Sequence, residues 1–580
     1  MPAAHLPRFS DPRDVDEFVV MLEKYESGEL TADQFRAFRL LRGVYGQRQE
    51  GTQMIRVKIP FGRLDSKGLE ALADVGERWS RGFGHVTTRQ NVQFHFVAMA
   101  DTEALMRRLD EAGLTTRDAC GNSVRAVTAC EVAEVCGSAP FDVSPHAEAV
   151  TRQFLGHPLA SSLPRKFKIA FSGCASDCAK AAIHDLGFIA KVEDGVAGFK
   201  VVAAGGLSSS PQNALVLHEF APVREMGRIG EAVLRMFHSL GNRENRQRAR
   251  LKYVRKKLGD QGFRETYAKI RAEVDAEALA ELTLPGPADR TPAGPVEGES
   301  NGARDGAYLA WRATSVIEQK SPGGDHEARQ SGYQGVYVRL RLGDMTSEEM
   351  RELGRIADTF GDGTVRLTID QNVLIPWVDK RSVGALFARL TKAGLARLDL
   401  HTVRDVTSCQ GAETCNLAVT SSRAVAAAIT AKLEAEGLGA VGDAARTLIK
   451  ISGCPNSCGQ HHIADLGFHG GAKNTGDGAV PVYQLHLGGG VDERGARFGR
   501  QVVKVIARRV PDAVVCMLRL FEEERTADET PAAFFSRVDG KRVVALLGEL
   551  VTAPPTPEER SDVGETAGFL IHSGEGECAA

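Results

Sequence analysis

Apolar and polar residues alternate in short stretches of this chain, and stretches with helical spacing lie between them. Alternation with a period of two predicts strands at 54–59, 85–97 and 337–342. Apolar residues spaced three and four apart predict amphipathic helices at 66–80 and 347–361, each with a serine near its start. Strands and helices that follow one another in this way indicate an α+β fold.

The whole pattern occurs twice, with a period near 280 residues. The segments "SGCASDCAKAAIHDLGF" (172–188) and "SGCPNSCGQHHIADLGF" (452–468) are identical at nine of seventeen positions. Upstream, "RAVTACEVAEVC" (125–136) matches "RDVTSCQGAETC" (404–415) at seven of twelve. A period this long is too great for a solenoid and predicts two fused homologous halves. The Pro-, Gly- and charge-rich segment 284–306 between them is predicted to be a linker.

Composition narrows the class of protein. The 580 residues are 43% hydrophobic and 25% charged, which is typical of a globular chain of several domains. A net charge of −3 gives no bulk electrostatic reason to expect nucleic acid or an anionic membrane as partner. No signal-peptide pattern and no long apolar run is present, so the prediction is a cytoplasmic protein without a membrane span.

Eight of the eleven cysteines fall into two sets with the same spacing. Each set is a C-x5-C pair followed, after 37 or 38 residues, by a C-x3-C pair. Cysteines in a cytoplasmic chain are metal ligands or free thiols more often than disulfides. Zinc favours closer pairs, so a [4Fe–4S] cluster is the better interpretation, with zinc and buried free thiols as alternatives. The first cysteine set is Cys130, Cys136, Cys174 and Cys178; the second cysteine set is Cys409, Cys415, Cys454 and Cys458.

The second set, written C-x5-C and then "SGCPNSCG", closely resembles that of the siroheme-containing sulfite and nitrite reductases. The motifs "TTRQNVQFH" (87–95), "LPRKFK" (163–168), "GNRENRQRARLKY" (241–253) and "LHLGGG" (485–490) extend the resemblance. It implies an internally duplicated α+β fold, with a central domain of two ferredoxin-like repeats and two α/β siroheme and cluster domains. The implied boundaries are an N-terminal extension 1–53, repeat 54–117, domain 118–283, linker 284–306, repeat 307–401, domain 402–551 and a disordered tail 552–580.

The resemblance also assigns roles to residues. The second cysteine set would hold the [4Fe–4S] cluster, and Cys458 would also be the axial ligand of the siroheme iron. Arg89 would pair with siroheme carboxylates, and Gln93 would lie in the same pocket. Four basic residues would surround the substrate anion: Arg56, Arg125, Lys166 and Lys168. The chemistry agrees, because arginine forks suit oxyanions and lysines crowded by other cations give up protons more readily.

The predicted reaction is the six-electron reduction of sulfite to sulfide. Plant-type nitrite reductases of the family usually have Asn where this chain has Lys168, which favours sulfite. A nitrite-preferring siroheme reductase is the alternative, and a non-catalytic iron–sulfur electron carrier is a more distant one. The chain has no dinucleotide-binding G-x-G-x-x-G between a strand and a helix and no flavin signature. Electrons are therefore expected from a ferredoxin or from a flavoprotein reductase subunit.

A second site related by the duplication would use the first cysteine set. Its basic pocket is incomplete, because Arg89 corresponds to Asp370 and Lys168 to Leu448. A second cluster, a non-catalytic siroheme and four free thiols all remain open for this set. In some actinobacterial members a cysteine at the position of Cys120 is crosslinked to a tyrosine, here Tyr45, and the same crosslink is a hypothesis for this chain.

Four histidines near the motifs are predicted to be hydrogen-bonded side chains rather than metal ligands, because the cysteines already account for the metal. They are His95, His184, His461 and His462.

Overall fold

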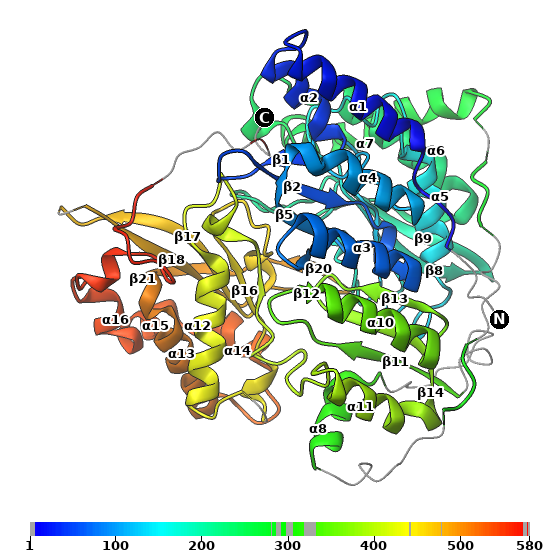
Figure 1. Cartoon of the computed structure of the whole chain (residues 1–580). Coiled ribbons are helices and arrows are strands. Elements are labelled where there is room, and N and C mark those ends of the chain that lie inside the picture. The colour runs from blue at the N-terminus through cyan, green and yellow to red at the C-terminus, as the bar shows by residue number, and fades with distance from the viewer. Residues whose placement is uncertain are drawn as a thin grey trace.

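The two halves build one central unit, and each half adds a domain beside it (Figure 1). The computed structural model describes residues 6–279, 281–285, 292–296, 306–317, 332–439, 442–476, 478–571 and 577. No helix in these ranges combines the length and the apolar character that a membrane span requires. Most of the predicted linker 284–306 lies outside the described residues.

The central unit contains two sheets that exchange strands. One sheet has the order β1-β2-β5-β4-β12 and the other β11-β14-β13-β3. Strand β12 of the second half pairs with β4 (Asp344 opposite His85), and β3 of the first half pairs with β13 (Leu64 opposite Val365). Each repeat therefore completes the other repeat's sheet. The bounds are β1 Val44–Gly46, β2 Thr52–Val57, β3 Arg63–Asp65, β4 Phe83–Val86, β5 Val92–Ala98, β11 Tyr333–Val338, β12 Asp344–Thr346, β13 Thr364–Leu367 and β14 Val373–Asp379.

Helices α3 (Ser66–Trp79) and α10 (Ser347–Phe360) lie side by side at the middle of this unit (Figure 1). Their apolar faces enter one core, in which Leu72 and Leu353 have no exposed surface. Both predicted helices are confirmed, although the capping residues Asp65 and Thr346 precede the serines. The other helices around the unit are α1 Pro12–Glu26, α2 Ala32–Leu41, α4 Thr102–Glu111, α8 Gly306–Ser315 and α11 Val383–Lys392.

The two outer domains have equivalent sheets, β10-β9-β8-β7-β6 and β15-β16-β17-β18-β21. In each sheet the first three strands in chain order run parallel and the next two pair antiparallel, which confirms the duplication. The strands are β6 Thr128–Ala129, β7 Ile169–Ser172, β8 Leu186–Glu193, β9 Val196–Ala203, β10 Leu215–Pro222, β15 Thr407–Ser408, β16 Ile449–Ser452, β17 Leu466–Asn474, β18 Ala479–Leu487, β21 Arg500–Ile506 and the separate pair β19 Gly490–Asp492 and β20 Gly495–Arg497. The helices are α5 Ser144–Phe154, α6 Met226–Leu240, α7 Leu251–Ala276, α12 Ser422–Ala435, α13 Val510–Glu524, α14 Pro531–Arg537, α15 Gly540–Leu547 and α16 Glu549–Thr552.

Several predicted elements differ from the observed ones. The segment 85–97 is two strands, because the turn between β4 and β5 places Gln90 at a φ of 56°. The strand predicted at 337–342 ends at Val338. Strand β1 belongs to the first sheet although it lies inside the predicted N-terminal extension. The tail was predicted to be disordered, but in its described part Asp562 is buried and accepts a hydrogen bond from the Ser421 amide at 2.7 Å.

Candidate active site

The second cysteine set gathers at one sheet edge because of the strand directions. Cys409 directly follows β15, and Cys454 and Cys458 follow β16. The two strands are parallel neighbours, so their carboxyl ends meet at the same edge. The Gly453 amide donates to Cys409 Sγ at 3.2 Å, which links the two loops. The pKa of the Cys454 thiol is raised by burial and next by Cys458, Cys409 and Cys415, so all four thiols are near neighbours.

These cysteines fit a multi-iron cluster better than a single ion. Donor atoms that could share a single metal ion must lie close together. In the part of the chain that the structure describes, three histidines meet this condition, and the cysteines of the second set do not. A thiol set that is mutually close yet wider than one ion suits a cluster, whose iron atoms are held by separate thiolates.

One cavity brings this set together with the predicted basic residues. The cavity measures about 1450 Å³, including the space open to solvent at its mouth, and lies between the central unit and both outer domains. Its walls include every residue assigned to the site through the resemblance: Arg56, Arg89, Gln93, Arg125, Lys166, Lys168, Cys409, Cys415, Cys454 and Cys458. The roles of these residues stay predictions.

The arginines are held by backbone carbonyls at the cavity wall. Arg125 donates to the Ala119 carbonyl at 3.0 Å, and Arg56 reaches the same oxygen at 3.4 Å. Arg89 donates to the Ala126 carbonyl at 2.5 Å and lies 2.6 Å from His184 Nε2. Burial and then the nearby Arg125 lower the pKa of Arg89 to about 9. Three guanidinium groups are thus concentrated where an anion would be favourable.

Lys168 lies in the cavity wall close to other cationic side chains. Its pKa is lowered well below the ordinary lysine value, first by burial and then by Arg89, Arg250 and Lys166. Its backbone amide donates to Asp185 Oδ2 at 2.9 Å, and Arg250 donates to the same carboxylate at 2.7 Å. Asp185 therefore fixes the backbone at Lys168, directly before β7. Sequence reasoning missed this pair, although Arg250 lies in the quoted motif 241–253.

We expect Asp185→Ala to lower the free energy of unfolding by about 3–5 kcal/mol, because Arg250 would keep a buried charge without its partner. Asp465→Ala is the matched control in the other half. Asp465 accepts from the Leu448 amide at 2.8 Å, and its pKa is raised to about 6 by burial. Its loss should cost only about 1–3 kcal/mol. Urea denaturation of both variants measures the difference, and equal losses would contradict the buried-pair argument.

The first cysteine set lies outside the cavity walls. Its members are also close together: burial and then Cys174 and Cys178 raise the pKa of Cys136, and Cys130 donates a hydrogen bond that lowers the pKa of Cys178 to about 7. Asp370, the counterpart of Arg89, instead forms ion pairs with Lys180 at 2.7 Å and with Lys450 at 2.5 Å.

Two other basic counterparts, Arg339 and Arg404, also form contacts within the protein. Arg339, the counterpart of Arg56, pairs with Asp399 and with Asp405, the latter at 3.3 Å. Arg404, the counterpart of Arg125, donates to the Leu438 carbonyl at 2.7 Å. Arg339 and Arg404 are therefore used to hold the fold together.

Two of the four histidines predicted to be hydrogen-bonded have a partner in the described part of the chain, and two do not. His184 contacts the Lys180 carbonyl at 2.6 Å, and His462 contacts the Ser208 carbonyl at 2.9 Å, so these two predictions are confirmed. The prediction is wrong for His95 and His461, whose ring nitrogens are buried without a hydrogen-bond partner among the described residues. His95 lines the cavity, where burial lowers its pKa to about 3.

The sequence singled out neither Arg165 nor Glu577 as cavity residues. Arg165 lies in "LPRKFK" directly before Lys166, whereas no local pattern marks Glu577. Tyr45 and Cys120 lie in one small buried cluster with Leu40 and Met54, so the proposed crosslink joins neighbours and stays a prediction.

Fold and site together define a duplicated α+β iron–sulfur protein with a cationic cavity. The family described as "Nitrite and sulphite reductase 4Fe-4S domain" matches residues 120–275 and 400–549, and "Nitrite/Sulfite reductase ferredoxin-like half domain" matches 45–112 and 326–393. The chain belongs to the siroheme nitrite and sulfite reductase family. It is an enzyme of that class, with siroheme and a [4Fe–4S] cluster as cofactors.

Relatives in the family bear both substrate names. A ferredoxin–nitrite reductase of Synechococcus elongatus is 31% identical over 80% of this chain and 85% of that protein. A sulfite reductase [ferredoxin] of Mycobacterium tuberculosis is 28% identical over 86% of this chain and 87% of that protein. The solved structure of the NirA protein of Mycobacterium tuberculosis superposes with a TM-score of 0.76 at 26% identity, covering 91% of this chain and 95% of that one.

Proposed function

We propose that this enzyme reduces sulfite to sulfide, using six electrons and seven protons to form hydrosulfide and three waters. The observation that carries the proposal is one cavity lined by four basic side chains together with the second cysteine set. The basic residues are Arg56, Arg125, Lys166 and Lys168. A doubly charged anion that leaves water for a buried site requires such compensation.

The cofactors would be held by the residues that line this cavity. The second cysteine set would bind the cluster, with Cys458 also on the siroheme iron, and Arg89 and Gln93 would contact the macrocycle. When bound, the siroheme and the cluster supply the electron storage that a six-electron reduction requires. The Thr88 hydroxyl donates to the Cys458 carbonyl at 2.9 Å, so the loop that carries Arg89 is tied to the cysteine loop.

The chain's own side chains would bind the anion and deliver protons. Arg56 and Arg125 would orient the oxygens through fixed guanidinium forks. Lys168 is suited to proton donation, because its lowered pKa brings the ammonium closer to the working pH. Each oxygen that leaves as water consumes two protons, so a proton donor beside the anion has a direct use.

Nitrite is the alternative substrate, reduced by six electrons and eight protons to ammonium and two waters. It is supported by the names of several relatives, the Synechococcus elongatus enzyme among them. We favour sulfite because of Lys168, where the resemblance associates Asn with nitrite reduction. We further propose a ferredoxin as electron donor, since relatives of both kinds carry ferredoxin in their names; a flavoprotein reductase subunit is the other option.

We expect kcat/KM to be higher for sulfite than for nitrite when both are measured with the same artificial donor, such as reduced methyl viologen. Sulfide and ammonium formation are the readouts. A higher kcat/KM for nitrite would overturn the sulfite proposal and favour the alternative. Turnover of neither anion by protein with a siroheme Soret band would contradict both.

A further inference from the structure

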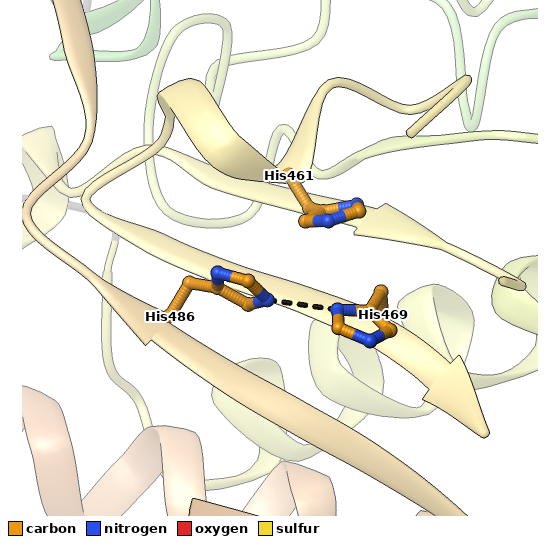
Figure 2. A group of neighbouring side chains, drawn as sticks. All are labelled: His461, His469 and His486. Carbon is orange, nitrogen blue, oxygen red and sulfur yellow. Dashed lines mark hydrogen bonds between the residues drawn. The ribbon is translucent and has the colours of Figure 1, made fainter. Parts of the chain in front are cut away.

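Three histidines of the second half converge at a place that the active site does not use. His461 lies in the short turn after Cys458, His469 on β17 and His486 on β18 (Figure 2). One ring nitrogen from each lies within 4.8 Å of the others, and we call this group the histidine trio. None of the three lines the cavity that holds the cysteines.

Two of the three histidines are buried and His469 is half-buried, and their ring nitrogens have few hydrogen-bond partners within the described ranges. His461 and His486 have no exposed surface. His469 Nδ1 lies 2.8 Å from His486 Nε2, the contact drawn in Figure 2, whereas neither nitrogen of His461 has a hydrogen-bond partner among the described residues. An imidazole buried in this way loses its hydration without compensation, which is unfavourable unless something else binds it.

The first half shows that the fold does not require these imidazoles. At the same positions it has Ala181, Ile189 and Val202, and these side chains belong to or pack against the apolar core of their domain. The duplication therefore provides an internal comparison: one half fills the space with hydrocarbon, and the other fills it with three nitrogen ligands.

We propose that the histidine trio binds one divalent transition-metal ion of the zinc class, separate from the siroheme and the cluster. Imidazole nitrogens are preferred ligands of such ions. The contact of 3.3 Å between His486 Nδ1 and the Gly499 carbonyl suits a ring whose Nδ1 carries the proton and whose Nε2 points at the metal. The proton now shared between His469 and His486 would move to the outer nitrogen of its ring.

Modest side-chain movement is needed to close the site. Nitrogens bound tetrahedrally at about 2.0–2.1 Å from one ion lie roughly 3.3 Å apart. One ring nitrogen from each histidine now lies within 4.8 Å of the others, so the wider separations would shorten, and the 2.8 Å contact between His469 and His486 would lengthen slightly. Burial, and after it His462, lowers the pKa of His469 to about 4 and that of His486 to about 3, so both rings are neutral ligands at neutral pH. Three ligands leave a fourth position for water or an anion.

Metal at the trio would have a mechanical consequence for the active site. His461 is three residues after Cys458, and the metal would tie this turn to two strands of the sheet. It would therefore help to fix the loop of a cluster ligand, without contact to the substrate.

The test uses the full holoenzyme. After chelator treatment and desalting, one equivalent of zinc chloride is added, excess is removed, and zinc and iron are measured by mass spectrometry. We expect about one zinc per chain, with an absorption-edge spectrum showing nitrogen ligands near 2.0 Å and no sulfur near 2.3 Å. Zinc that is lost on desalting, or zinc bound to sulfur, would overturn the proposal. The zinc spectrum is element-specific, so siroheme does not obscure it.

Variants in which a trio histidine is replaced by its first-half counterpart test where the ion binds. His469→Ile and His486→Val should each reduce bound zinc to less than about a fifth, with iron content and siroheme absorbance unchanged. His218→Gln is the control, because His218 contacts the Tyr267 hydroxyl in the other half at 2.8 Å, and zinc should stay near one. Retention of zinc by both trio variants would contradict the site. If these variants fail to fold, the ligand atoms seen in the wild-type spectrum decide.

Discussion

Cys458→Ser should lower kcat for sulfite and for nitrite by at least about a thousandfold, which corresponds to roughly 4 kcal/mol of transition-state stabilisation. Cys458 lies in the cavity wall with the basic residues, and its thiolate is the proposed link between cluster and siroheme. A serine hydroxyl is a poor replacement for a thiolate on iron. Product formation with reduced methyl viologen measures the loss, and iron content and the siroheme absorbance show which cofactor is affected.

Cys178→Ser is the matched control, since Cys178 is the counterpart of Cys458 in the other half. It lies outside the cavity and accepts a hydrogen bond from Cys130. We expect its kcat to stay within about twofold of the wild type. Comparable losses in the two variants would contradict the assignment of the working cluster to the second half.

A comparison of the wild-type protein with Cys178→Ser also tests whether the first cysteine set binds metal. We propose that this set holds a second cluster, because its four thiols are also mutual neighbours. Wild-type protein should then contain about nine iron atoms per chain, eight in two clusters and one in siroheme, and about eight acid-labile sulfides, whereas Cys178→Ser should contain about five and four. Five iron atoms and four acid-labile sulfides in the wild type, unchanged in the variant, would mean that the first set consists of free thiols.

Much of the site could be predicted from sequence because its information is local. The cysteine loops follow strands β15 and β16 directly, so spacing alone shows that two pairs act together. Because of the duplication, each motif can be compared with its counterpart in the other half. This comparison shows that Asp370 replaces Arg89 and Leu448 replaces Lys168 in the second half. The structure places Asp370 in ion pairs with two lysines, in agreement with a pocket that has lost its anion-binding role.

Other features depend on contacts between distant segments and leave no local signal. The exchange of β3 and β12 between the two sheets pairs residues roughly 260 to 300 positions apart. The Arg250–Asp185 pair joins a helix start to a strand, and the histidine trio needs the register of β17 and β18. Each histidine alone is more often a hydrogen-bonded core residue than a ligand, and only their convergence changes that interpretation.

Lys168→Asn should lower kcat/KM for sulfite by about a hundredfold, which is within the range expected for loss of a general acid, and for nitrite by only about tenfold. Sulfite carries more charge and one more oxygen to protonate, so it should depend more on this ammonium group. Lys191→Asn is the control. Lys191 is exposed on β8, where it pairs with Glu193, and its replacement should change kcat/KM neither for sulfite nor for nitrite. Equal losses for the two anions would contradict the role of Lys168 in substrate preference.

The pH dependence tests whether Lys168 gives protons as well as charge. Its pKa lies below the ordinary lysine value, first because of burial and then because of Arg89. A lysine donates only when protonated, so wild-type kcat/KM for sulfite should fall as the pH rises through this lowered pKa and be fully present below it. Asparagine does not titrate, so this alkaline decline should be absent from Lys168→Asn. A decline that persists unchanged in the variant would assign the titration to another group and leave Lys168 with a purely electrostatic role.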